Sequence, residues 1–296
     1  MPIWTKQPVV SPAPRPITAK ETPKPVKLPR GSTIQVDRFL GGGGFGRVYA
    51  VKGQPLAAKV VARKHKELAK VAEREATALA ALNHPNIVAF KGYYKAPDGF
   101  LLVSELCTGG NLEPLVKAGG LPETQAHPLI RQVTSAMAYC HGMGIIHRDL
   151  KPANIVFVDA TKTTLKIIDF GACEILPTSG NRPLKDHVQT LGYSAPEVSF
   201  SKEPFDGFKA DSFSLGVVYV GLVQGCGGGR FAKSGWLQQP TLSGASAELR
   251  GLMAGLLHGW PGPRKTITET AASPYFDQKL ENVVDWMNEI DLDVAK

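Results

Sequence analysis

Long apolar runs and closely paired cysteines are both missing from this sequence. No stretch of about eighteen consecutive apolar residues occurs in its 296 residues, so nothing in it predicts a membrane-spanning helix. The four cysteines are scattered without C-x-x-C spacing, at Cys107, Cys140, Cys173 and Cys226. We therefore expect reduced thiols in an intracellular, cytoplasmic protein, with a plastid or a membrane surface as the alternatives. A hydrophobic content of 43% can bury one large core or two lobes.

Acidic side chains are scarce in the first 30 residues, where six basic residues face Glu21 alone. The whole chain carries a net charge of +8, of which the remaining residues hold only +3. A basic tail on a near-neutral domain is weak support for nucleic-acid binding, and we expect none. Residues 1–30 contain eight prolines, no helical or strand periodicity and no signal-peptide apolar region. This composition predicts an extended linker, although an anionic surface or a processed targeting segment would also suit it.

Two polar turns in the middle of the chain carry the residues best suited to chemistry. The first, Ile146-His147-Arg148-Asp149-Leu150-Lys151-Pro152-Ala153-Asn154, precedes the β-like run 155–158. The second, Asp169-Phe170-Gly171, follows the apolar run 165–168. Asn154 and Asp169 offer hard oxygen ligands of the kind that Mg²⁺ prefers, which leaves Asp149 to accept a hydroxyl proton. The arrangement indicates a site for a metal ion and a polyphosphate.

These turns resemble the H-R-D-L-x-x-x-N and D-F-G motifs of the eukaryotic-type Ser/Thr protein kinases. The resemblance covers residues 34–276 and implies an α+β fold of two lobes, one β-rich with a single helix αC and one mainly helical. It also implies ATP and Mg²⁺ as cofactors and protein substrates for a monomeric enzyme. Asp149 would orient the attacking hydroxyl, and Lys151 would reach the transferring phosphate and mark Ser/Thr specificity. Dual specificity stays open, as does a pseudokinase scaffold, which usually lacks Lys59, Asp149 or Asp169.

A glycine-rich stretch runs from Phe39 to Tyr49 and fits G-x-G-x-x-G at positions 41, 43 and 46. The Rossmann form of this pattern needs a helix after the loop, whereas the sequence from Val48 continues as a strand. We predict a hairpin tip whose backbone closes over phosphates, although a flexible turn has the same composition. The resemblance implies these nucleotide-binding residues: Leu40, Gly41, Gly42, Gly43, Gly44, Phe45, Gly46, Val48, Ala57, Lys59, Glu105, Cys107, Asn111, Val156 and Asp169.

A lysine and a glutamate complete the catalytic set that the resemblance implies. Lys59 resembles the strand lysine that grips the α- and β-phosphates. Residues 64–82 have apolar positions near 3.6-residue spacing, which predicts a helix ending before His84-Pro85. Glu75 lies nine residues before His84, where the family has its αC glutamate, and Glu73 is the competing candidate. The catalytic residues implied are Asp149, Lys151, Asn154, Lys59 and Glu75, and the metal ligands are Asn154 and Asp169.

The connection between the lobes is expected next. We predict strands over residues 87–90 and 100–103 and a helix over 123–143. Backbone groups of Glu105 and Cys107 would bond adenine, and the small Ser104 would control the space behind it. Two stacks of apolar residues are implied, although each could be ordinary core. One holds Leu79, Phe90, His147 and Phe170, and the other holds Val48, Ala57 and Val156.

Residues 172–195 lack periodicity and end in a stretch that resembles the family's T-x-x-Y-x-A-P-E, from Thr190 to Glu197. A long loop of this kind within a compact domain is usually functional. The resemblance implies that Asp211 bonds the catalytic-loop backbone and that Arg264 pairs with Glu197. No element is predicted over residues 221–247. Residues 277–296 have one apolar face and predict an amphipathic helix, packed on its own lobe or waiting for a partner.

Arg148 is the residue that in many kinases binds a phosphate on the activation loop. The matching phosphosite here is Asp186, and the positions of two further basic groups hold Val71 and Glu174. We therefore hypothesise activity without activation-loop phosphorylation, with Arg148 bound to an acid, Asp186 or Glu174. In the alternative, Asp186 is a solvated loop acid and Thr178 or Ser179 is the switch.

Overall fold

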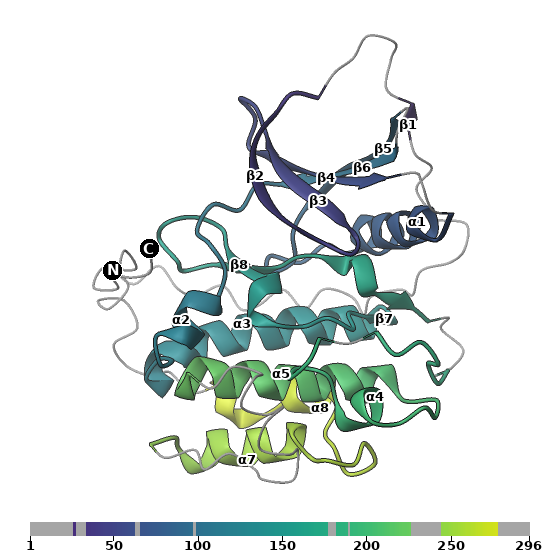
Figure 1. Ribbon diagram of the computed structural model, residues 1–296. Coiled ribbons are helices and arrows are strands. Elements are labelled where there is room, and N and C mark those ends of the chain that lie inside the picture. The colour runs from purple at the N-terminus through teal and green to yellow at the C-terminus, as the bar shows by residue number, and fades with distance from the viewer. Residues whose placement is uncertain are drawn as a thin grey trace.

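Seven stretches of the chain are described in the computed structural model, and they build two lobes (Figure 1). They are residues 26–27, 34–62, 66–96, 99–176, 182–188, 190–225 and 244–277. A twisted sheet and one helix form the upper lobe in Figure 1, and helices form most of the lower lobe. The predicted α+β architecture is confirmed.

The sheet of the amino-terminal lobe consists of five antiparallel strands and one short parallel edge strand, in the order β1-β5-β6-β4-β3-β2. The five strands are β2 (Val36–Gly43), β3 (Gly46–Val51), β4 (Leu56–Ala62), β5 (Phe90–Ala96) and β6 (Gly99–Glu105). The edge strand β1 (Val26–Lys27) pairs with Tyr94 and Lys95 of β5. The end of the basic tail therefore joins the sheet, which the absence of strand periodicity in residues 1–30 did not predict.

The helix α1 (Lys66–Ala81) lies against the sheet, within two residues of its predicted start and one of its predicted end. Ala72 and Ala76 are fully buried between the helix and the strands. Their small side chains let the helix approach the sheet closely, and Val61, Tyr93 and Leu102 complete this apolar cluster. The cluster sets the depth at which Glu75 enters the space between the lobes.

The strand predicted over residues 87–90 is wrong, because β5 begins only at Phe90. Ile87 instead forms an isolated parallel bridge with Ile167, and the Val88 amide donates to the Ile167 carbonyl. The Asn86 side chain donates to the Leu165 carbonyl at 2.9 Å. Ile87 and Val88 are buried because they connect the two lobes. The apolar composition therefore predicted their burial correctly, but it wrongly predicted that they form a strand.

The second lobe is built around two long helices, α3 (Glu123–Gly142) and α5 (Gly207–Gln224). Around them lie α2 (Glu113–Lys117), α4 (Pro196–Ser199), α7 (Ala247–Leu256) and α8 (Ile267–Ala271). Asp206 caps the first turn of α5 through the amides of Phe208 and Lys209, and Gly225 ends the helix in a left-handed conformation. The helix is buried on nearly all sides and contributes much of the core. Within the described part of the chain, no helix has the length and apolarity needed to cross a membrane.

Short elements carry the polar turns between the lobes. The hairpin β8 (Ile155–Phe157) and β9 (Leu165–Ile167) lies between the turns, and β7 (Ile145–Ile146) pairs with β10 (Glu174–Ile175). Within the described residues there are also three 3₁₀ segments, Pro152–Asn154, Phe170–Ala172 and Pro274–Asp277. Thr178, Ser179, Cys226, most of the unassigned stretch 221–247 and residues 278–296 of the predicted amphipathic helix lie outside the described residues.

Candidate active site

The first polar turn is held in shape by a buried carboxylate from α5. Asp211, which is 1% exposed, accepts hydrogen bonds from the amides of His147 at 2.7 Å and Arg148 at 2.8 Å. The ring of His141 lies 3.1 Å from the same carboxylate. Arg148 has a φ of 67°, a left-handed conformation that a non-glycine residue adopts only when its surroundings enforce it. The predicted bonding of Asp211 to this backbone is confirmed.

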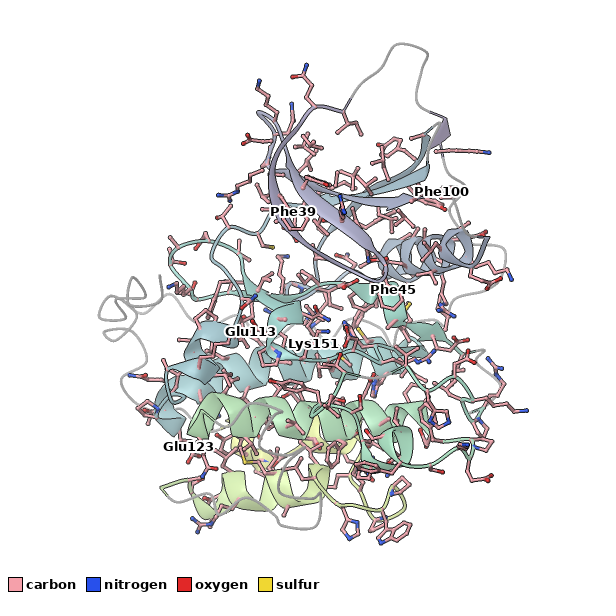
Figure 2. The ribbon with its side chains drawn as sticks, viewed as in Figure 1. Phe39, Phe45, Phe100, Glu113, Glu123 and Lys151 are labelled. Atoms are coloured by element: carbon pink, nitrogen blue, oxygen red, sulfur yellow. The ribbon has the colours of Figure 1, made fainter. Side chains whose placement is uncertain are left out.

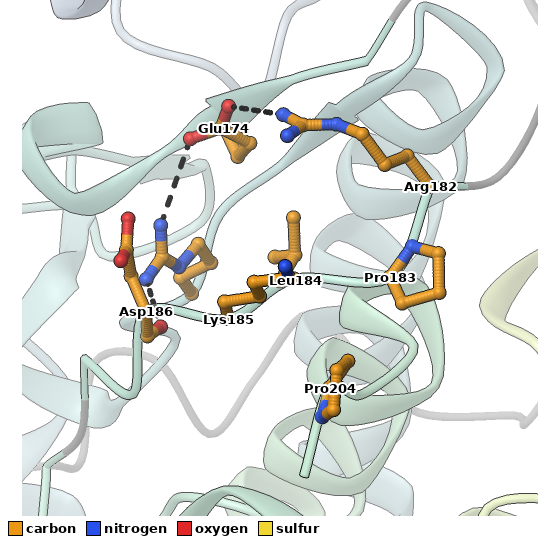
Figure 3. Close-up of a pocket in the computed structure, with 8 residues that line it drawn as sticks. Glu174, Arg182, Pro183, Leu184, Lys185, Asp186 and Pro204 are labelled. Atoms are coloured by element: carbon orange, nitrogen blue, oxygen red, sulfur yellow. Dashed lines mark hydrogen bonds and ion pairs between the residues drawn. The ribbon is translucent and has the colours of Figure 1, made fainter. Parts of the chain in front are cut away.

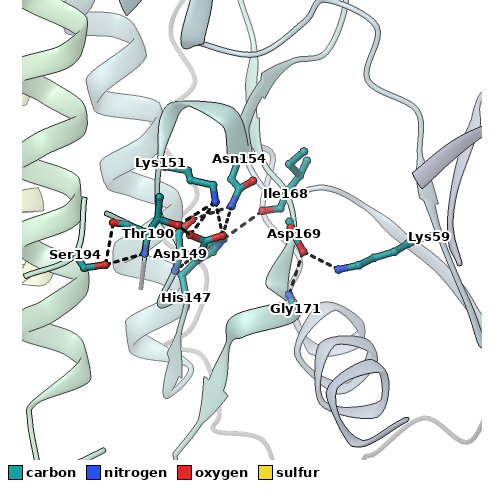
Figure 4. A network of polar contacts seen from close by, with 10 residues as sticks. All are labelled: Lys59, His147, Asp149, Lys151, Asn154, Ile168, Asp169, Gly171, Thr190 and Ser194. Atoms are coloured by element: carbon teal, nitrogen blue, oxygen red, sulfur yellow. Dashed lines mark hydrogen bonds and ion pairs between the residues drawn. The ribbon is translucent and has the colours of Figure 1, made fainter. Parts of the chain in front are cut away.

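Asp149 projects from this turn into a cluster of donors (Figure 4). Lys151 Nζ lies 2.8 Å from Asp149 Oδ2, and Thr190 Oγ1 lies 2.5 Å from Asp149 Oδ1. The Asn154 side chain donates to the Asp149 carbonyl at 2.8 Å and to Oδ2 at 3.1 Å. All three neighbours donate hydrogen bonds to Asp149, so they hold its side chain in one position, from which it can orient a hydroxyl and accept its proton.

Lys59 is enclosed by two carboxylates. Its Nζ lies 2.7 Å from Glu75 Oε2 and 2.6 Å from Asp169 Oδ1. Burial alone would lower the pKa of Lys59, but the two carboxylates outweigh burial and raise it, so the side chain stays an ammonium. For Asp169, burial opposes ionisation, and the attraction of Lys59 prevails and lowers its pKa. The predicted contact between Lys59 and Glu75 is confirmed, and Glu73 is not part of this pair.

The turn that carries Asp169 is fixed by its own backbone geometry. Asp169 has a φ of 59°, and its side chain accepts from the Gly171 amide at 3.3 Å. Phe170 is fully buried, and its ring meets the ring of His147 edge-on with centroids 4.8 Å apart. Leu79 and Phe90 belong to the same apolar core. The expected stack therefore has the contact between His147 and Phe170, which joins the two polar turns.

The glycine-rich stretch is a hairpin, as predicted, with Gly43 paired to Gly46 across the tip. Gly46 has a φ of 138°, and a Cβ there would lie 2.6 Å from the Val60 carbonyl oxygen, so only glycine fits. Phe45, at the lower end of the hairpin in Figure 2, contacts Gly171 and lies 5.9 Å from Lys59 Nζ. The hairpin tip therefore covers the Lys59–Asp169 pair.

Comparison with known proteins gives the same assignment as this geometry. The family model described as the protein kinase domain matches residues 34–276. The chain belongs to the protein kinase family. It is 36% identical over 198 residues to calcium-dependent protein kinase 5 of Plasmodium berghei, covering 64% of this chain and 34% of that protein.

Two further relatives match over a longer part of the kinase chain. Sperm motility kinase 2B of Mus musculus is 34% identical, with 80% of this chain and 50% of that protein covered. Meiosis-specific serine/threonine-protein kinase mek1 of Schizosaccharomyces pombe is 32% identical, with 81% and 58% covered. The chain thus spans about a third to about three fifths of the length of these curated relatives.

The hinge of the kinase lies at the end of β6. The Glu105 side chain accepts from the Ala89 amide at 2.7 Å and pairs with Lys166 of β9 at 2.7 Å. The Glu105 carbonyl accepts from Ser104 Oγ at 3.2 Å. Cys107 is half-buried, and burial together with the charge of Glu105 raises its pKa to about 11. Its thiol is therefore neutral at physiological pH.

The remaining predicted nucleotide-binding residues surround this hinge on both lobes. Ala57 is buried on β4 opposite Ser104, and Val48 and Val156 are half-buried. Asn111 pairs with Val156 in an isolated bridge, and its side chain accepts from the Glu113 amide at 3.0 Å. Leu40 to Gly44 lie above them on the largely exposed end of β2 and its turn. The structure thus gathers the set around one interlobe space, and its nucleotide contacts remain predictions.

The donor set fits a Mg²⁺ ion that also binds phosphate. The Asn154 amide nitrogen is engaged with Asp149, which leaves its carbonyl oxygen and the Asp169 carboxylate as hard oxygen ligands. Among the described residues no group of three or more His, Cys, Asp or Glu side chains could hold a metal ion. Two protein ligands are few for an all-protein cage, but they suit an ion that completes its coordination with water and phosphates.

Two arginines outside the catalytic cluster, Arg264 and Arg148, form ion pairs that test the predictions made for them. Arg264 is fully buried and forms a two-pronged pair with Glu197 at 2.6 and 2.9 Å, as predicted. Arg148 pairs with Glu174 at 3.7 Å, whereas it reaches only the backbone carbonyl of Asp186. The expectation that Arg148 binds an acid, Asp186 or Glu174, is therefore met by Glu174. We also expected positions 71 and 174 to leave Arg148 without basic neighbours. Arg74 and Arg182 nevertheless lie beside it, because both donate to Glu174.

Sequence reasoning missed Thr190 as a member of the centre. It entered only as the first residue of the T-x-x-Y-x-A-P-E stretch, 41 positions after Asp149. Its position in that stretch was the available signal, since the contact itself depends on how residues 182–195 fold back over the catalytic loop. Thr190 also lies 3.1 Å from Lys151 Nζ, so one hydroxyl contacts both residues.

Proposed function

We propose that this kinase transfers the γ-phosphoryl group of ATP to serine and threonine hydroxyls of protein substrates. One observation carries the proposal: the Asp149 carboxylate is held by Lys151 and Thr190, in the same interlobe space as the Lys59–Asp169 pair. Asp149 with its neighbours suits a hydroxyl acceptor, and the Lys59–Asp169 pair suits a polyphosphate. The names of several relatives, which include serine/threonine-protein kinases, support the same acceptor class.

Each residue then has a defined role in the transfer. Asp149 orients the acceptor hydroxyl and takes its proton, while Lys151 neutralises charge on the phosphoryl group in transit. Lys59, fixed by Glu75, positions the phosphates of ATP beneath the glycine-rich hairpin. Asn154 and Asp169 would hold Mg²⁺, which when bound neutralises charge on the phosphates. Backbone groups of Glu105 and Cys107 would bond adenine.

A direct assay with matched aspartate variants tests this function. Wild type, Asp149→Asn and the exposed control Asp37→Asn are given Mg²⁺-ATP and peptides with a single Ser, Thr or Tyr. We expect Ser and Thr phosphorylation by wild type and control, reduced about 100-fold or more in Asp149→Asn because the proton acceptor is lost. Equal background rates for all three proteins contradict catalysis and favour a scaffold. Comparable rates on Tyr peptides contradict acceptor selectivity.

We further infer that the kinase is active without activation-loop phosphorylation. Arg148 already faces the carboxylate of Glu174, so it does not require the −1.5 to −2 charges that a phosphate would bring. The test compares wild type, dephosphorylated and checked by mass spectrometry, with the double variant Thr178→Ala/Ser179→Ala. Retained activity in both supports the inference. Loss of activity in either contradicts it.

A further inference from the structure

Three arginines from three different parts of the fold converge on Glu174. Arg74 of α1 donates to Glu174 Oε2 at 2.9 Å, and Arg148 of the catalytic loop pairs with the same oxygen at 3.7 Å. Arg182, beyond the undescribed residues 177–181, donates to Oε1 at 3.3 Å. Glu174, Arg148 and Arg182 line a cavity of about 510 Å³, and Figure 3 shows Arg182 reaching Glu174 there.

Glu174 is held firmly enough to serve as an anchor. It belongs to β10, where it pairs with Ile146, the residue just before the catalytic-loop motif. It lies five positions after Asp169, and the intervening turn has Phe170 and Cys173 fully buried. The backbone of Glu174 is therefore held relative to both polar turns of the active site by contacts that do not involve the arginines.

Arg74 precedes Glu75 on α1, so the two side chains leave the helix about 100° apart. Arg74 reaches Glu174, and Glu75 reaches Lys59 at 2.7 Å. A helix held at two such points can neither rotate nor slide without breaking one of them. The bond between Arg74 and Glu174 therefore sets the rotation that brings Glu75 to Lys59.

Charge makes Glu174 necessary to this cluster. The Arg148 side chain is only 5% exposed, and Glu174 is 16% exposed. Among the described residues, the Nε atoms of Arg74 and Arg148 are buried without a hydrogen-bond partner. Without the carboxylate, the buried Arg148 guanidinium would face that of Arg74, which is 32% exposed, with no Glu174 charge between them. Removal of one partner of a buried ion pair is costly for this reason.

We propose that Glu174 is a positioning residue, whose carboxylate holds α1 and the catalytic loop in their active arrangement through Arg74 and Arg148. This inference rests on the proposed function and identifies how that site is regulated: the chain itself supplies the anion. Arg182 extends the arrangement to the activation segment. Because its side chain is 64% exposed, that bond adds little stability and mainly sets the course of the segment.

Three variants separate positioning from general stability. Glu174→Gln keeps the shape and removes the charge, Glu174→Asp keeps the charge, and Glu67→Gln breaks an exposed ion pair on the same helix as a control. In dephosphorylated enzyme we expect kcat to fall at least about tenfold in Glu174→Gln, because small displacements of reacting groups are costly. The KM for peptide should change less than about twofold, because Glu174 is not proposed to contact peptide. Glu174→Asp should recover part of kcat, and Glu67→Gln should match wild type.

Hydrogen exchange supplies a readout that does not depend on activity. Amides of residues 70–81 should exchange faster in Glu174→Gln than in wild type or Glu67→Gln, while amides of α5 keep their protection. If wild type shows no kinase activity but the exchange pattern is as expected, the positioning role is supported and the proposed function is contradicted. An unchanged kcat in Glu174→Gln, or unchanged exchange in α1, overturns the positioning role. Equal loss of protection in α1 and α5 assigns Glu174 a merely structural part and also overturns it.

Discussion

Thr190 shows at the scale of single residues how an active site extends beyond its motifs. Its hydroxyl lies 2.5 Å from Asp149 and 3.1 Å from Lys151, so it orients both side chains. Lys59, Asp149 and Asp169 were predictable because short contiguous motifs mark each of them, and Glu75 was predictable from its distance to His84. A contact between residues far apart in the chain leaves no such local pattern.

The first prediction concerns this hydroxyl. Thr190→Ala should lower kcat about 10- to 100-fold, because a hydrogen bond to a charged group is worth about 1.5–3 kcal/mol. Thr190→Ser keeps the hydroxyl and should stay within about threefold of wild type. Steady-state kinetics on one peptide measure both, and equal rates for Ala and Ser would show that the hydroxyl has no such role.

The second prediction concerns Ser104, which pairs in register with Ala57 on β4 and Phe90 on β5. Since its side chain is small, inhibitors with enlarged aromatic groups should bind in the space behind adenine. Ser104→Phe should fill that space and raise their inhibition constants more than about tenfold, while the KM for ATP changes little. Ser104→Ala is the size-matched control. An unchanged constant in Ser104→Phe would place the aromatic group elsewhere.

Among the elements, the helices predicted over residues 64–82 and 123–143 and the strand predicted over residues 100–103 are confirmed, whereas the strand predicted over residues 87–90 is wrong. The limits of α1 and α3 lie within two residues of prediction, because apolar periodicity and the stop at His84-Pro85 are local. The run from Ile87 to Phe90 has the composition of a strand, but its first residues bridge to Ile167 in the other lobe. Contact with the other lobe keeps these residues out of the sheet, and such a tertiary contact cannot be predicted from local composition.

Helix phase also explains the misassigned basic group on α1. The family position falls at Val71, whereas Arg74 reaches Glu174. The two residues are three apart, so they lie on nearly the same face of the helix, one turn along. The family position therefore identifies the face of α1 that points toward Glu174, but the basic residue on that face is Arg74 and not the residue at position 71.

The third prediction concerns the connection between α4, α5 and residues 258–264. Buried Arg264 pairs with Glu197, donates to the carbonyls of His258 and Lys209, and lies 5.1 Å from the Phe213 ring. Arg264→Ala should destabilise the protein by about 3–5 kcal/mol, because Glu197 loses its partner in a largely buried site. Arg264→Lys should restore charge without the two-pronged geometry and recover only part of the loss. Denaturant unfolding measures both, and a loss below about 1 kcal/mol for Ala would contradict the anchoring role.

At the scale of the whole molecule, the candidate site lies between two lobes that contribute different parts of it. Lys59, Glu75 and the glycine-rich hairpin belong to the sheet lobe, and Asp149 and Asn154 belong to the helical lobe. The order of motifs along the chain sufficed to predict this division. How the activation segment folds back onto Arg148 did not follow, because residues 172–195 have no periodicity to constrain it.

The fourth prediction uses this division. Mg²⁺-ATP at about 100 times its Kd should stabilise the folded kinase by about 2.7 kcal/mol and raise Tm by roughly 5–10 °C. Asp169→Asn should lose the part of the shift that depends on Mg²⁺, because one of the two proposed ligands is weakened. Asp37→Asn, exposed on β2, should keep the full shift. Thermal scans with ATP alone and with Mg²⁺-ATP measure the difference, and an undiminished Mg²⁺-dependent shift in Asp169→Asn would remove the metal assignment.

The burial of Asp211 in α5 has a consequence for how tolerance to mutation is distributed along the gene. The bend of the catalytic loop depends on one carboxylate in α5, a helix with most of its residues buried, more than sixty positions downstream. Substitutions that shift this helix by a fraction of an ångström should lower the rate of phosphoryl transfer even where they leave the stability of the fold unchanged. In a saturation screen scored on activity, the inner face of α5 should therefore show the same intolerance as the loop that touches substrate.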